Sequence, residues 1–95
     1  MKIELINMFH EGDLKPELIS YENIEYVKRW YRTYSYDVNF DINKALKLMS
    51  MFYYYEDLPI ENEYANICNS ISKEYSIEKE SVLDMYFSFR KWLLE

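Results

Sequence analysis

The side chains best suited to catalysis or metal binding are few and widely separated in this 95-residue sequence. His10 is the only histidine and Cys68 the only cysteine, so the chain has no disulfide pair and no zinc-ligand cluster of its own. Glu56 and Asp57 are adjacent carboxylates, but neighbours on a helix point about 100° apart and do not share an acid–base site. We therefore expect a protein that is not an enzyme, uses no cofactor or metal, and holds Cys68 as a free, buried thiol.

A second set of residues has the composition of a nucleic-acid site. Residues 28–34, KRWYRTY, interleave three bases with three aromatic residues, which together can contact a phosphate backbone and stack on bases. The candidate residues are Lys28, Arg29, Trp30 and Arg32. On a helix the two tyrosines of this segment would face the core, and Glu25 would neutralise Arg29 from one turn away. We therefore treat direct nucleic-acid binding as the alternative function.

The C-terminal part of the chain has the organisation of a helix, a turn and a second helix, as DNA-binding helix-turn-helix units do. The turn contains no glycine, and the start of the second helix carries Glu78, Glu80 and Asp84, which phosphates would repel. A packed helical hairpin is the better interpretation. The hairpin remains part of the alternative nucleic-acid hypothesis.

The strongest candidate for a binding surface is a stretch of tyrosines and acids near the middle of the chain. No positive charge occurs between Lys47 and Lys73. The candidate partner-binding residues are Tyr54, Tyr55, Glu56, Asp57, Glu61 and Glu63. Exposed tyrosines concentrate binding energy, and surrounding acids attract a basic partner and reject others. The competing interpretation is a solvated corner between two helices, but three consecutive tyrosines cannot all face the core.

The overall charge narrows the choice of partner. Seventeen acids stand against eleven bases, a net charge of −6, which disfavours nonspecific attraction to DNA or anionic lipid and suits a basic protein. The N-terminal apolar stretch is too short and too charged for a signal peptide, and no apolar run approaches the ~20 residues of a membrane span. We expect a cytoplasmic protein without a membrane segment.

The elements that must position these residues are helices. One glycine and two prolines leave little material for hairpins, and apolar residues recur at spacings of three and four. The central helix is predicted over Asp41–Asp57, with Asp41 as its cap. The other predicted helices cover residues 2–10, 20–34, 58–75 and 77–94, the last capped by Ser76. Two points stay open: whether the first segment is a strand, and whether Pro16–Ile19 continues into the next helix.

These observations predict an all-α fold: a compact bundle of four to five short helices in a single domain. For function they favour a small acidic module that binds a basic surface of a nuclease or another nucleic-acid-processing protein. An immunity protein, an antitoxin or a phage-encoded inhibitor would act in this way. The oligomeric state is not fixed by the sequence.

Overall fold

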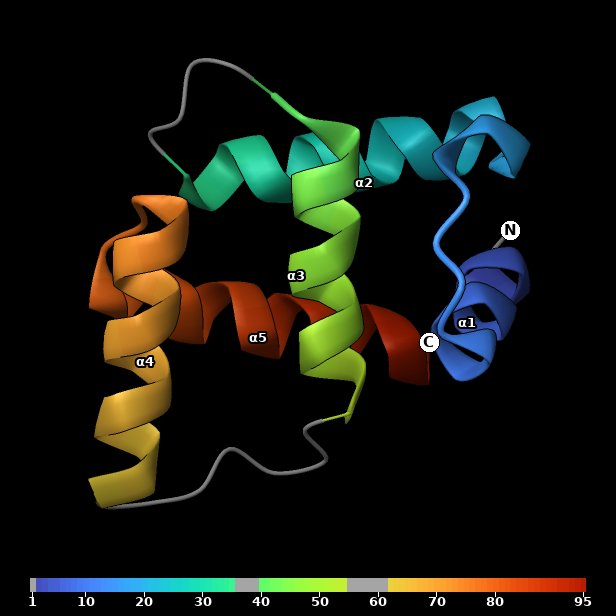
Figure 1. Ribbon diagram of the computed structural model, residues 1–95. Coiled ribbons are helices and arrows are strands. Elements are labelled where there is room, and N and C mark those ends of the chain that lie inside the picture. Colours follow the sequence, from blue (N-terminus) through green and yellow to red (C-terminus); the bar gives the residue numbers. More distant parts are fainter. Residues whose placement is uncertain (1, 36–39, 55–61) are drawn as a thin grey trace.

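The computed structural model describes residues 2–35, 40–54 and 62–95, without the side chains of 62–65 and 67 (Figure 1). Its described residues form five α-helices, one 3-10 turn and no strand, which confirms the predicted all-α fold. The elements are α1 (Lys2–Glu11), η1 (Pro16–Leu18), α2 (Tyr21–Tyr34), α3 (Ile42–Tyr54), α4 (Asn62–Tyr75) and α5 (Lys79–Leu94).

Helix α3 crosses two helices that pack against each other, α2 and α5 (Figure 1). Helix α4 packs on the first part of α5, and α1 lies near its last part. Two contacts join α1 to α5: the rings of Phe9 and Phe89 are 6.1 Å apart, and the ammonium of Lys2 donates to the carbonyl of Trp92 at 2.7 Å. The two ends of the chain therefore lie on the same side of the molecule.

The centre of the core is α3, as the apolar spacing predicts. The fully buried side chains of this helix are those of Ala45, Leu46, Leu48, Met49 and Phe52. Asp41 caps the helix, because its Oδ1 accepts the backbone N–H of Asn43 at 3.0 Å. The helix begins one residue after Asp41 and is described to Tyr54, so the predicted end at Asp57 lies outside the described residues.

The two open points at the N-terminus are settled. The first segment is helical, and Gly12 ends it with a φ of 71° while its N–H donates to the carbonyl of Met8 at 3.0 Å. Glycine takes this left-handed conformation without steric penalty, which confirms the predicted stop. Pro16–Leu18 forms a separate turn, because Ile19 after it is extended and α2 begins only at Tyr21.

The predicted cap of the last helix is wrong. Ser76 has a φ of 56°, and the N–H of Ile77 donates to the carbonyl of Ser72 at 3.2 Å, so these residues close the end of α4 in a Schellman motif. Helix α5 starts at Lys79, after Glu78. A serine between two helices resembles an N-cap in sequence, but here it occupies the left-handed position that glycine normally fills.

Candidate functional site

The predicted tyrosine and acid surface is represented in the structure by one side chain, that of Tyr54. Its hydroxyl donates to the backbone carbonyl of Phe9 at 2.5 Å, and 59 % of the residue is exposed. Tyr54 is therefore accessible to a partner, although its hydroxyl is engaged by α1 and its ring contacts that of Tyr53. The remaining members lie outside the described residues or have side chains outside the description: Tyr55, Glu56, Asp57, Glu61 and Glu63.

The alternative basic site is divided between core and surface. Trp30 is only 3 % exposed, and its indole N–H donates to the carbonyl of Met85 on α5 at 3.1 Å. Its ring cannot stack on a base without opening the core. Lys28 is half-buried, and Arg29 and Arg32 are exposed on the outer side of α2. The expected pair between Glu25 and Arg29 is absent from the ion pairs within 4 Å in the described part of the chain.

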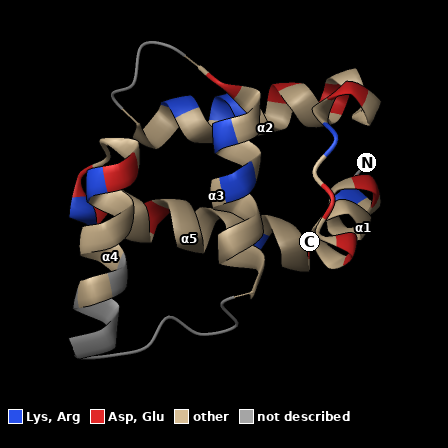
Figure 2. Ribbon diagram, viewed as in Figure 1, with Lys and Arg blue, Asp and Glu red and all other residues tan. Residues whose placement is uncertain are grey.

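Charge is segregated along the molecule, a feature that none of the short motifs above predicts. Residues 2–25 contain six acids and two bases, whereas the described residues between 28 and 47 contain five bases and one acid. Figure 2 shows acidic residues on α1, on the segment that follows it and at the start of α2, and basic residues farther along α2 and on the first half of α3. The signal was available in the sequence as a charge count over the first 25 residues.

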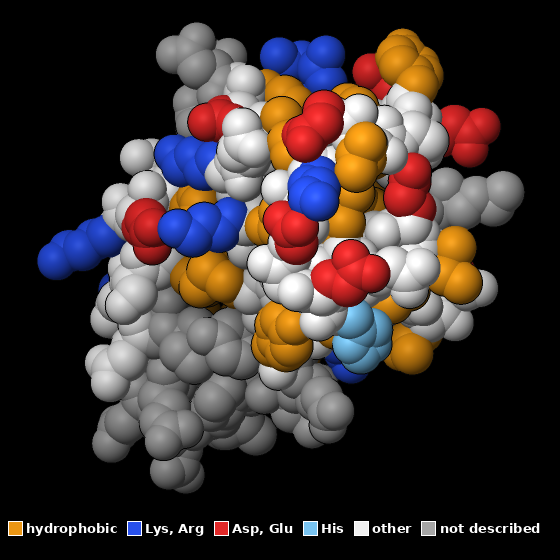
Figure 3. All heavy atoms as spheres, turned by 45° about the vertical axis from the view of Figure 1, so that its right-hand side comes forward, with side chains coloured by type: hydrophobic (Ala, Val, Ile, Leu, Met, Phe, Trp, Pro, Cys, Tyr) orange, Lys and Arg blue, Asp and Glu red, His pale blue; other side chains and the backbone are white. Residues whose placement is uncertain are grey.

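We call the acid-rich side of α1, η1 and the start of α2 the acidic face. Its exposed or half-buried members are Glu4, Glu11, Asp13, Glu17, Leu18, Tyr21 and Glu22, and one base, Lys15, lies among them. Two large apolar side chains are exposed on it, Leu18 at 63 % and Tyr21 at 75 %. Figure 3 shows this side of the molecule, where acidic and hydrophobic side chains are interspersed at the surface with fewer basic ones. Hydrophobic side chains among charges that are mainly of one sign are typical of protein-binding surfaces.

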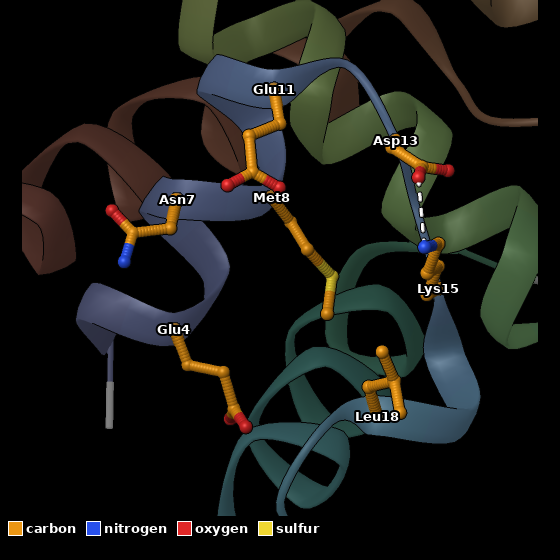
Figure 4. Close-up of a pocket in the computed structure, with 7 residues that line it drawn as sticks. All are labelled: Glu4, Asn7, Met8, Glu11, Asp13, Lys15 and Leu18. Atoms are coloured by element: carbon orange, nitrogen blue, oxygen red, sulfur yellow. Dashed lines mark ion pairs between the residues drawn. The ribbon is translucent and has the colours of Figure 1, made fainter.

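A cleft of about 280 Å³ opens in the acidic face between α1 and η1 (Figure 4). Its lining residues are Glu4, Asn7, Met8, Glu11, Asp13, Lys15 and Leu18. The side chain of Met8 extends from α1 into the cleft toward Leu18 and forms part of its apolar wall (Figure 4). The cleft thus combines three carboxylates with the flexible apolar side chain of Met8 and the ammonium of Lys15.

The three carboxylates of the cleft are used differently. Asp13 pairs with Lys15 at 3.1 Å, the one ion pair found among the described residues. Glu4 accepts from the backbone N–H of Ser20 at 3.0 Å and from the side-chain amide of Asn23 at 2.6 Å. The Ser20 bond is the main reason that the pKa of Glu4 lies below its usual value. Glu11 is exposed and has no such partner among the described residues, so it is the carboxylate of the cleft most available to a ligand.

Among the described residues, no group of three or more His, Cys, Asp or Glu side chains is placed to hold a metal ion. None of the helices that these residues form combines the length and apolarity of a membrane span.

Comparison with other proteins does not supply a function. No family model matches the chain, and neither a curated protein nor a solved structure shows significant similarity to it.

Proposed function

We propose that this protein is a small binding module that covers a basic surface of another protein, and that the acidic face is its contact region. The observation that carries the proposal is the coincidence on one side of exposed carboxylates, two exposed apolar side chains and a cleft. The acids would attract the partner, and the apolar side chains would hold it after contact. An inhibitor or immunity protein for a nucleic-acid-processing enzyme fits this chemistry, because such enzymes carry basic substrate channels.

The individual residues suit these two roles. Glu11, Glu17 and Glu22 are exposed, so their charge acts on an approaching partner through solvent and mainly affects the association rate. Leu18 and Tyr21 present apolar area that binding would remove from water, which mainly slows dissociation. A lysine or arginine of the partner entering the cleft would meet Glu11 and the thioether of Met8.

The test is capture of partners from a lysate of the native host at low and high salt. Wild-type protein is compared with Glu11→Lys/Glu17→Lys on the acidic face and with Glu56→Lys/Asp57→Lys in the surface predicted from sequence. We expect the wild type to retain basic proteins at low salt and the Glu11→Lys/Glu17→Lys variant to lose them. For a purified partner, this variant should lower the association rate by tenfold or more at low salt, and less as salt rises.

The control reverses charge elsewhere by the same amount. Arg29→Glu/Arg32→Glu alters two exposed side chains of α2 and should leave capture of a basic partner intact or improve it. Loss of capture only in Glu56→Lys/Asp57→Lys would transfer the site to the predicted surface. Loss only in Arg29→Glu/Arg32→Glu would refute the proposal.

The second candidate function is direct nucleic-acid binding by the basic side of α2 and α3. It is favoured by the gathering of Lys28, Arg29, Arg32, Lys44 and Lys47 on two helices that contact each other (Figure 2). It is disfavoured by the burial of Trp30, which removes the stacking platform of the segment. A mobility shift that weakens steeply with salt and disappears in Arg29→Glu/Arg32→Glu would support it.

A further inference from the structure

A second pocket lies where the C-terminal ends of α1, α3 and α5 approach one another. Its volume is about 460 Å³, within the ~300–1,000 Å³ range of small-molecule sites. The lining residues are His10, Tyr53, Tyr54, Arg90, Leu93 and Leu94. We call it the Arg90 pocket, and it lies apart from the cleft of the acidic face because the two share no lining residue.

The polar groups on one side of the Arg90 pocket are held in place. The hydroxyl of Tyr53 lies 2.6 Å from Nε2 of His10, and the two rings meet edge to face with centroids 5.2 Å apart. Tyr54 is fixed by its bond to the carbonyl of Phe9, and its ring meets that of Tyr53 edge to face at 5.4 Å. When the Tyr53 hydroxyl donates to Nε2, the neutral imidazole carries its hydrogen on Nδ1 and remains a donor. A ligand would therefore meet aromatic walls that are already ordered.

Arg90 is the only lining residue with a permanent charge. It is half-buried beside Leu93 and Leu94, and no carboxylate of the described residues lies within 4 Å of its guanidinium. An arginine presents five donors in a planar fork that matches a carboxylate. A guanidinium that has no carboxylate partner among the described residues and lies against apolar walls is unusual in a chain whose acids outnumber its bases, since pairing would stabilise it.

Two backbone carbonyls at the helix ends around the pocket, those of Phe9 and Trp92, already have donors. Free carbonyls at helix C-termini carry partial negative charge and could be what Arg90 compensates. The carbonyl of Phe9 already accepts from the Tyr54 hydroxyl and, at 3.3 Å, from the N–H of Gly12. The carbonyl of Trp92 accepts from the Lys2 ammonium at 2.7 Å and from the N–H of Glu95 at 3.3 Å. These carbonyls are satisfied, and the guanidinium keeps its capacity for a ligand.

We propose that the Arg90 pocket binds a carboxylate attached to an aromatic or branched apolar group. Arg90 would bind the carboxylate oxygens, and the apolar group would lie between Leu94, which is 83 % exposed, and the ring of Tyr54. This ligand has the opposite charge to the partner proposed for the acidic face, so the two sites are independent. The same chemistry occurs in free aromatic acids and at the C-terminus of a peptide that ends in an aromatic residue.

The test is an NMR titration of the folded protein with two matched pairs of probes. The first pair is 3-phenylpropionate and its neutral amide, and the second is the tripeptide Ala-Ala-Phe with a free and with an amidated C-terminus. We expect saturable shifts at Tyr54, Arg90 and Leu94 with the free acids, and at least about tenfold weaker binding of the amides. Binding of one acid alone would support the proposal and identify the source of the carboxylate.

Variants assign the charge contact. Arg90→Gln should weaken binding of the free acid by about tenfold or more, whereas Lys91→Gln, which removes an exposed charge from the neighbouring position, should change it less than about twofold. If Arg90→Gln fails to fold, the comparison of acid with amide on the wild type and the Arg90→Lys variant decides the question. Equal affinity for acid and amide, equal effects of the two glutamine variants, or no saturable shift at about 10 mM probe would overturn the proposal.

Discussion

The carboxylate of Glu4 on α1 accepts the backbone N–H of Ser20, the residue that precedes α2. The first N–H groups of a helix have no partner within the helix and require an acceptor from elsewhere. Ser20 is the residue that should supply one, yet its side chain makes no capping bond. Glu4 instead binds the start of α2 through both Ser20 and Asn23, so a residue 16 positions away fixes how α1 and α2 meet.

This contact makes the stability of the folded protein depend on pH. The hydrogen bond from the Ser20 N–H, followed by that from the Asn23 amide, lowers the pKa of Glu4 below its ordinary value of 4.5. The contribution of Glu4 to the free energy of unfolding is therefore fully present above about pH 4.5 and is lost as the pH falls through the lowered pKa of the folded state. We expect wild-type urea midpoints to fall with pH in this range. In Glu4→Gln the fall should be shallower, because the neutral amide no longer titrates. Equal slopes in both proteins would show that Glu4 makes no folded-state contact of this kind.

The end of α4 should be easy to stabilise. A residue with a side chain at φ of 56° is strained relative to glycine, and Ser76 holds this position in the Schellman motif. We expect Ser76→Gly to raise the free energy of unfolding by roughly 0.5–1 kcal/mol, measured by urea denaturation. Ser72→Gly, inside α4, is the matched control and should lower it by roughly the same amount. Destabilisation by both changes would mean that Ser76 is not left-handed in solution.

The hydroxyl of Tyr26 should be dispensable. Its ring stacks on that of Trp92 at 4.3 Å, and its buried oxygen has no hydrogen-bond partner in the described part of the chain. Burial, followed by the negative charge of Glu95, raises the pKa of this hydroxyl above its ordinary value. Because an unsatisfied buried polar group costs about 1–3 kcal/mol, Tyr26→Phe should leave stability unchanged or raise it.

The matched control for Tyr26 is Tyr54→Phe. This change removes a hydroxyl that has a partner, the carbonyl of Phe9, and should lower stability by about 0.5–1.5 kcal/mol. Both variants lose a tyrosine hydroxyl oxygen, so the difference between their melting temperatures compares the loss of a hydrogen-bonded hydroxyl with the loss of one that has no partner among the described residues. A larger loss for Tyr26→Phe than for Tyr54→Phe would contradict the contact pattern.

Two phenylalanines on α5 test where the core ends. Phe89 is fully buried between Phe9 and Trp30, with ring centroids 6.1 and 6.2 Å away, whereas Phe87 is 61 % exposed. We expect Phe89→Ala to cost about 3–5 kcal/mol and Phe87→Ala less than about 1 kcal/mol in chemical denaturation. Similar losses at the two positions would mean that α5 is rotated relative to this arrangement.

Local chemistry made the helices predictable. The spacing of Leu46, Met49 and Phe52 determines which face of α3 is buried. Asp41 caps the start of α3 and Gly12 ends α1 through contacts within one helical turn, which a local sequence pattern can predict. The prediction for Ser76 was wrong because a serine between two helices can cap the start of the second or follow the end of the first. Which of the two occurs depends on the tertiary packing of Ile77, which is buried here while its N–H closes the end of α4.

The candidate sites were harder to predict because they depend on packing between distant segments. The composition of the 28–34 segment does not reveal that Trp30 points at Met85 of α5. The Arg90 pocket joins residues of α1, α3 and α5 that are separated by up to 84 positions, and no local pattern brings them together. The acidic face was partly accessible, since its charge bias is local, but its cleft depends on the fold of η1 back against α1.

The bond between Lys2 and Trp92 has a consequence for the order in which the chain can fold as it is made. Helix α1 leaves the ribosome before α5, yet Phe9 packs on Tyr53 and Phe89, and Lys2 binds the carbonyl of Trp92, all of which follow later in the chain. At ~5–20 residues per second, α1 waits about 4–16 s for α5 to be synthesised. Until then the contacts of α1 with Phe89 and Trp92 cannot form, so a ribosome-bound chain that stops before α5 should leave α1 more open to chaperones and proteases.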